Sequence, residues 1–162
     1  MVSLQTLLVS VFLCLLPISE LRGGLPYALA KGVPPIPAFL LCTAANTLVG
    51  PLLYLFLGSL HRLLDRWAPY HALFERLIER SRQKVRGKIE KYGFWGLTIF
   101  IALPLPFTGA YTGALGAWVL GFRARKAFLA VACGVFLAGL IVTAVFLLGL
   151  KPLYFFIKSQ PA

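Results

Sequence analysis

Long apolar runs alternate with short polar or proline-rich interruptions along this chain. Residues 4–18 are helical in composition, but 15 residues rise about 22 Å, less than the roughly 30 Å hydrocarbon core of a bilayer. Residues 36–60 and 127–150 are each long enough to cross that core. The pattern therefore predicts an all-α integral membrane protein in which a short, broken apolar unit precedes each spanning helix.

The first interruption, at residues 17–26, reads PISELRGGLP and carries two charges inside an apolar region. Its prolines and glycines are expected to break the helix, which should resume for about two turns to residue 31 and stop in the loop 32–37. Ionisable residues in lipid usually face a cavity or a partner and mark function. Broken helices are tolerated there only where the freed backbone is buried in protein or lines a cavity. We interpret residues 17–26 as the tip of a substrate site.

The second interruption, PLPFTG at residues 104–109, divides another apolar unit that continues to residue 120. It carries no charge. It offers the hydroxyls of Thr108, Tyr111 and Thr112 and two small residues, Gly109 and Gly113. The glycines suit either a binding tip or ordinary helix packing.

The two broken units are related by a weak internal repeat. Gly32 and Gly121 are 89 positions apart (121 − 32), and at this offset nine of the 34 positions from 17 to 50 are identical. Chance in so apolar a chain would give roughly one match in ten. The predicted repeat unit is a broken apolar segment, a turn with glycine and a full span.

Composition and charge agree with a membrane protein and exclude a soluble enzyme. The chain is 59% hydrophobic with a mean hydropathy of +0.84, and it carries 16 Lys and Arg against five acids. The formal net charge is +11, and most of the charged residues lie in residues 61–91, which have roughly helical apolar spacing. We expect a basic amphipathic helix on the cytoplasmic side that contacts anionic lipid headgroups, and no nucleic acid partner.

Charge also favours one topology. If each broken unit crossed the membrane fully, the linker and the basic turn at residues 121–126 would fall on opposite sides. Re-entrant hairpins place both on the cytoplasmic side and give an inverted repeat whose two tips meet near the midplane, as in secondary transporters. The predicted parts are a first repeat (1–60, hairpin 4–31 and span 36–60), the linker (61–91), a second repeat (92–150, hairpin 93–120 and span 127–150) and a tail (151–162).

The first tip provides the candidate chemistry. Arg22 is predicted to bind an anionic group, and phosphate in particular, through its planar guanidinium. Glu20 is the candidate proton-coupling carboxylate. A structural ion pair between the two is the alternative. The full set of candidate substrate-binding residues is Ser19, Glu20, Arg22, Gly23, Gly24, Thr108, Gly109, Tyr111 and Thr112.

Other chemistry is not indicated. The three cysteines, Cys14, Cys42 and Cys133, lie in apolar runs without metal-ligand spacing, and no nucleophile–base set is visible. We therefore expect no metal site, no cofactor and no enzymatic activity. A chain this short encloses little by itself, so a homodimer is one arrangement to test.

The motifs at residues 17–26, 91–96 and 104–113 together make the chain resemble the small multidrug export family, over nearly its whole length. That family is similar in turn to DedA-like membrane proteins with paired re-entrant loops. The resemblance implies movement of polyprenyl-phosphate carrier lipids or other lipids across the cytoplasmic membrane of a prokaryote, coupled to protons. This chain departs from the DedA-like pattern in being shorter and in lacking a second buried acid or arginine.

Three functions follow from these observations. The first is a flippase-type transporter of a lipid-linked phosphate, and the second is an exporter of lipophilic cations with Glu20 as the cation site. Arg22 counts against the second, because it would neutralise Glu20 and repel the cation. The third is a non-transporting membrane scaffold, which has no need of two broken units.

Overall fold

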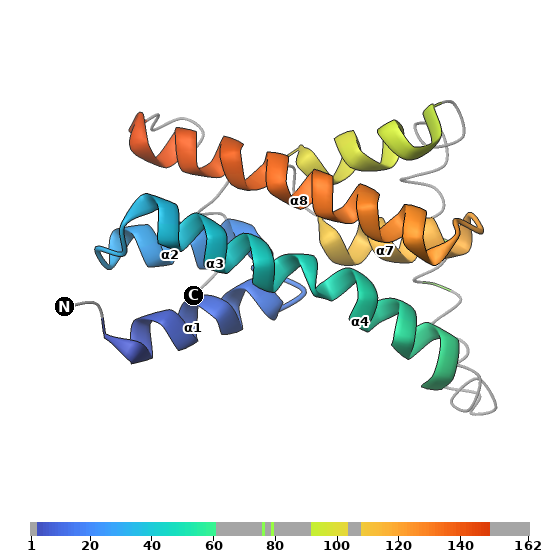
Figure 1. Ribbon diagram of the computed structural model, residues 1–162, viewed down its shortest axis with the longest axis horizontal. Helices are drawn as coiled ribbons and strands as arrows, with labels where there is room; N and C mark the ends of the chain where they lie inside the picture. The colour runs from blue at the N-terminus through green and yellow to red at the C-terminus, as the bar shows by residue number, and fades with distance from the viewer. Residues whose placement is uncertain (1–2, 61–75, 77–78, 80–91, 104–107, 150–162) are drawn as a thin grey trace.

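The computed structural model describes residues 3–60, 76, 79, 92–103 and 108–149. Every regular element in these ranges is helical, so the predicted all-α class is confirmed (Figure 1). The elements are α1 (Leu4–Leu15), α2 (Glu20–Ala30), α3 (Pro35–Thr47), α4 (Val49–Leu55), the π-helical turn η1 (Phe56–Leu60), the helix Tyr92–Ala102, α7 (Ala110–Val119) and α8 (Ala124–Leu147).

Among the described residues, two stretches have the length and apolarity to cross a membrane: Pro35–Leu55, with 21 residues, and α8, with 24. The shorter α1 leaves large side chains uncovered at four-residue spacing, with Leu4 71%, Leu8 62% and Phe12 61% exposed. This spacing puts them on one helix face. Such an apolar face is suited to contact with lipid.

The predicted break at Pro17 is confirmed, but the break is shorter than predicted. The chain leaves helix only at residues 16–19, and α2 then runs through Gly23, Gly24 and Pro26. The expectation that these three residues interrupt the helix is wrong. Pro26 removes only one intrahelical donor. Gly24 is needed for close packing, because a Cβ there would lie 2.3 Å from the Cys14 sulfur on α1.

The predicted loop 32–37 is also shorter than expected, because α3 begins at Pro35. The first backbone nitrogens of a helix have no intrahelical acceptor, so prolines are tolerated in the first turn. The first span is interrupted at Leu48, between α3 and α4. Pro51 accounts for this break, because its nitrogen has no hydrogen to donate to the carbonyl of Thr47.

The ends of α2 and α7 share one geometry. Gly32 and Gly121 both adopt positive φ, at 81° and 71°. Glycine adopts that conformation without the steric penalty of a Cβ. The backbone hydrogen bonds recur 89 positions apart: Gly32 N to Leu29 O and Gly121 N to Trp118 O, each 3.0 Å, then Val33 N to Ala28 O at 3.1 Å and Phe122 N to Ala117 O at 2.9 Å.

The α3–α4 stretch and α8 lie side by side and run in opposite directions (Figure 1), and the place where they pack together is called the helix crossing below. The hairpin of α1 and α2 lies at one end, and the helix Tyr92–Ala102 with α7 lies at the other. Gly139 of α8 meets Phe39 of α3, where a Cβ would come within 2.8 Å of the ring. Gly50, at the equivalent position of α4, faces Val131 of α8. Small residues at both places let the two backbones approach.

The predicted linker and tail lie outside the described residues, except for the isolated linker positions 76 and 79. The predicted divisions of the chain therefore stay predictions at those places. The second span begins earlier than predicted, because α8 starts at Ala124 rather than at residue 127.

Candidate functional site

The turn at the first tip holds one residue in an unusual backbone conformation. Glu20 has a φ of 46° and is the one non-glycine residue with positive φ in the described part of the chain. Such a conformation costs on the order of 1–3 kcal/mol and persists where surrounding contacts determine it. The Ser19 hydroxyl donates a hydrogen bond to the carbonyl of Leu13, and the Glu20 amide donates to the carbonyl of Leu16 at 3.0 Å.

The Glu20 carboxylate reaches from the first tip into the second. Its Oε2 accepts a hydrogen bond from the Ala110 amide at 3.1 Å, and its Oε1 accepts one from the Tyr111 amide at 3.3 Å. These amides open α7 and have no acceptor within that helix. The positive end of the helix dipole also favours a carboxylate there. The side chain is only 7% exposed, so Glu20 acts as a buried cap of α7.

Gly109 provides the space for this cap. A Cβ at position 109 would lie 1.9 Å from Oε2 of Glu20, well inside any real contact distance. Positions 20 and 109 are 89 apart, the offset of the repeat. Equivalent positions of the two units therefore face each other, and only one of them has a side chain.

Arg22 connects the same two tips. Its Nη2 donates to the carbonyl of Leu103 at 3.0 Å and to the Thr108 hydroxyl at 2.7 Å. The Thr108 hydroxyl in turn donates to the carbonyl of Leu103 at 2.7 Å. In the opposite direction the Tyr111 hydroxyl donates to the carbonyl of Leu15. Arg22 and Tyr111 are also 89 positions apart, so each reaches the end of the first helix in the other unit.

The structure thus brings together five of the nine candidates: Glu20, Arg22, Thr108, Gly109 and Tyr111. The other four lie elsewhere. Ser19 closes its own turn, and a Cβ at Gly23 would lie 2.6 Å from Ser19 Cβ. Gly24 packs on α1, and Thr112 is half-buried on α7.

Side-chain pattern could not reveal the backbone groups of the site. The carbonyl of Leu103 and the amides of Ala110 and Tyr111 form hydrogen bonds to Arg22 and Glu20. These are backbone groups, which nearly every residue type has. The available signal was the break at residues 104–109, because helix ends leave carbonyls and amides unpaired on either side. Within the described ranges, no group of three or more His, Cys, Asp or Glu could hold a metal ion.

These features define the class: an all-α membrane protein in which two broken apolar units meet through a buried carboxylate and a guanidinium. Residues 20–141 match the family described as "Putative small multi-drug export protein". The match covers more than half of the chain and contains Glu20, Arg22 and the second tip, so the protein belongs to that family. The family resemblance of the sequence is thereby confirmed. No curated protein and no solved structure matches the chain.

Proposed function

We propose that this membrane export protein moves a lipid-linked phosphate, such as a polyprenyl-phosphate carrier, across the bilayer together with a proton. The main support is that the Glu20 carboxylate accepts hydrogen bonds from the first amides of α7, with Arg22 two residues further along the chain. A helix start with exposed amides is an anion site. Here the protein's own carboxylate occupies it.

An internal anion in an anion site suggests a coupling mechanism. A proton on Glu20 would remove the charge that α7 attracts and would weaken the hold of both amides. A phosphate could then take the vacated amides of Ala110 and Tyr111, with Arg22 as its counter-charge. Proton and phosphate would bind together, and loss of the proton would return Glu20 to α7 and expel the phosphate.

The proposed architecture is an inverted repeat of re-entrant hairpins, related to DedA-like proteins. In its support, α1 has 12 residues and rises about 18 Å, too short to cross the hydrocarbon core. The two hairpins also lie at opposite ends of the molecule, while their tips meet through Glu20 and Arg22 (Figure 1). We further propose that the basic linker lies on the cytoplasmic side of a prokaryotic membrane, where it contacts anionic lipids.

Export of lipophilic cations is the second candidate, because the family description names multidrug export. On this reading Glu20 would bind the cation. Its two oxygens already accept amide hydrogen bonds, and Arg22 lies close by in the same cluster. A cation would therefore have to displace the α7 cap and overcome the repulsion of a guanidinium.

Transport in proteoliposomes separates the two cargoes. We expect fluorescent polyprenyl phosphate to move between leaflets faster than in protein-free vesicles, and an ethidium-like cation not to. The Arg22→Ala variant should lose this movement, while Lys31→Ala, which removes an exposed cation at the end of α2, should keep it. The recovered lipid should have unchanged mass, because we propose transport without a chemical step. Lipid-phosphate movement that survives Arg22→Ala would refute the proposal.

Cysteine labelling tests the topology independently. In a background without Cys14, Cys42 and Cys133, single cysteines at positions 81 and 123 should react with an impermeant reagent from the same side. Reaction from opposite sides would refute the re-entrant arrangement, whatever the cargo is.

A further inference from the structure

Two open grooves flank the helix crossing at equivalent positions. One, of about 480 Å³, lies between α4 and the start of α8. The other, of about 410 Å³, lies between the start of α3 and the end of α8. Both fall within the roughly 300–1,000 Å³ of ligand sites. Six lining positions correspond at the offset of 89: Pro51, Tyr54 and Leu55 with Leu140, Thr143 and Ala144, and Pro35, Ile36 and Phe39 with Ala124, Arg125 and Phe128.

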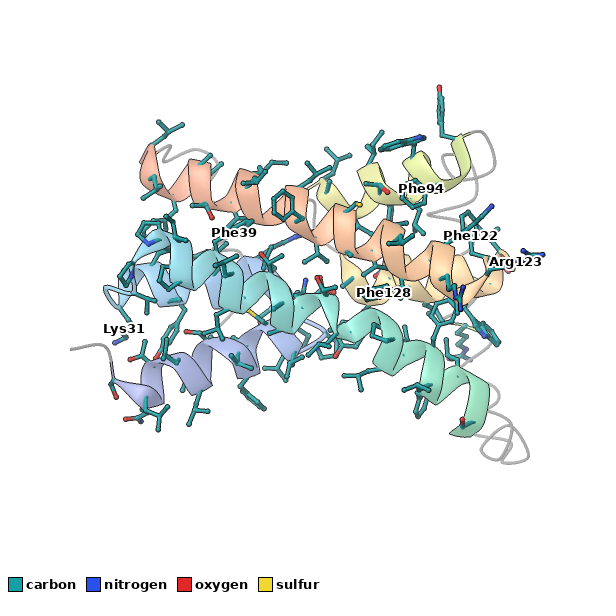
Figure 2. All side chains as sticks on the ribbon, in the orientation of Figure 1. Lys31, Phe39, Phe94, Phe122, Arg123 and Phe128 are labelled. Carbon is teal, nitrogen blue, oxygen red and sulfur yellow. The ribbon has the colours of Figure 1, made fainter. Side chains whose placement is uncertain are left out.

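The grooves are alike in their apolar walls but differ in charge. Phe39 and Phe128 lie on opposite sides of the crossing, and Arg123 lies at the end of the molecule beyond Phe128 (Figure 2). Arg125 lines the α4–α8 groove, whereas Ile36 takes the equivalent place in the other. Arg125 is exposed, and no acid in the described part of the chain pairs with it.

The first turns of α8 and α3, which line the two grooves, also differ in how well they could bind an anion. The first turn of α8 contains Arg125 and Lys126, follows Arg123 and has no acidic residue or side-chain cap. Cations at a helix start oppose its dipole, so this arrangement favours a nearby anion. The first turn of α3 contains Pro35 and Pro37, which have no N–H to donate. Only the α4–α8 groove therefore combines apolar walls with a cation and donor-bearing backbone.

Each groove also has one unpaired hydroxyl. Tyr54 lines the first and Thr143 the second, and neither hydroxyl finds a hydrogen-bond partner among the described residues. Buried hydroxyls are normally paired. The two hydroxyls therefore mark one polar point in the wall of each groove, which an occupant with an oxygen atom could pair.

We infer that the α4–α8 groove binds an anionic phospholipid, with the phosphate at Arg125 and the start of α8 and an acyl chain along Leu55 and Phe128. A second copy of the chain fits less well, because a two-fold contact through this groove would bring two basic helix starts together. The inferred lipid site does not depend on the proposed transport function. Its further role, as the entry groove for the cargo, rests on the proposed function.

Native mass spectrometry of the full chain tests the site with phosphatidylglycerol and phosphatidylcholine as probes. We expect the wild-type protein to retain phosphatidylglycerol preferentially. The Arg125→Gln variant should bind phosphatidylglycerol about tenfold more weakly than the wild type, as expected for loss of one charged hydrogen bond. Ile36→Gln, the matched change in the other groove, should leave the preference unchanged. Equal retention of both lipids by the wild type, or no effect of Arg125→Gln, would overturn the inference.

A second pair of variants tests occupation of the apolar part. Leu55→Trp should fill the α4–α8 groove and reduce bound phosphatidylglycerol, whereas Ala144→Trp fills the equivalent groove and should not. If the spectra instead show dimers that Leu55→Trp dissociates, with lipid retention unaltered, the groove is an interface between copies and the inference fails.

Arg22→Gln distinguishes this failure from failure of the proposed function. We expect it to abolish lipid-phosphate movement while keeping the Arg125-dependent lipid preference. Absence of movement in the wild type, with that preference intact, would overturn the transport proposal and leave the lipid site standing. Movement in the wild type without that preference would overturn the lipid site alone.

Discussion

The two broken units end in the same backbone geometry, at Gly32 and Gly121, but their tips contribute different chemistry. The first supplies charged side chains, Glu20 and Arg22, while the second supplies mainly backbone amides, a carbonyl and a hydroxyl. The difference is greatest at positions 20 and 109, which correspond in the repeat and touch in space. Where equivalent positions meet, there is room for one side chain. A duplicated fold must therefore become unequal at that point, and here it does so by pairing a glutamate with a glycine.

Replacing the glycine of this pair should have the largest effect. In Gly109→Ala the new Cβ would lie 1.9 Å from Oε2 of Glu20, so the carboxylate must leave α7. We expect destabilisation of about 3 kcal/mol or more, from overpacking and loss of the cap, and loss of transport. Thermal unfolding in detergent measures the change. Gly50→Ala, whose Cβ would lie 3.3 Å from Val131, should cost far less.

The double variant Glu20→Ala with Gly109→Ala sharpens this test. Truncating the glutamate removes the clash, so the double variant should be more stable than Gly109→Ala alone while remaining inactive. Equal stability of the two variants would mean that the glycine is required for another reason.

Removing only the charge of Glu20 should have a smaller structural effect but a specific functional one. Glu20→Gln keeps an oxygen for one α7 amide, and we expect a stability loss of about 1–2 kcal/mol. If Glu20 carries the coupled proton, lipid-phosphate movement in this variant should no longer respond to an imposed pH gradient. A response equal to that of the wild type would exclude Glu20 as the coupling group.

Much of this site could be predicted from sequence, for a physical reason. Charges and prolines within apolar runs locate the breaks, and helix breaks in lipid must find partners, which is why Glu20, Arg22 and Thr108 were recognisable. The prediction that Gly24 and Pro26 break the helix was wrong, because helix propensity carries no information about how closely α1 approaches α2. The cap on α7 also could not be foreseen. It depends on backbone amides and on the contact between positions 20 and 109, which only the packed structure provides.

Thr108 tests the contribution of the second tip to holding Arg22. Thr108→Val keeps the shape but removes the hydroxyl that accepts from Nη2 of Arg22 and donates to the Leu103 carbonyl. We expect a loss of about 1–3 kcal/mol, because a half-buried charged donor loses one acceptor. Thr112→Val, one turn of α7 away, is the control and should change the unfolding temperature little. A similar loss in both variants would show that Thr108 has no special role.

The smallest effect is expected at Tyr111, which makes the opposite connection. Tyr111→Phe removes only the hydroxyl that donates to the carbonyl of Leu15, a neutral hydrogen bond worth about 0.5–1.5 kcal/mol. The Tyr111 amide remains, so the cap by Glu20 should persist and transport should continue. Tyr27→Phe on α2 is the matched control. If Tyr111→Phe abolished transport at unchanged stability, the hydroxyl would contact the cargo, and a side chain of the second tip would take part in transport directly.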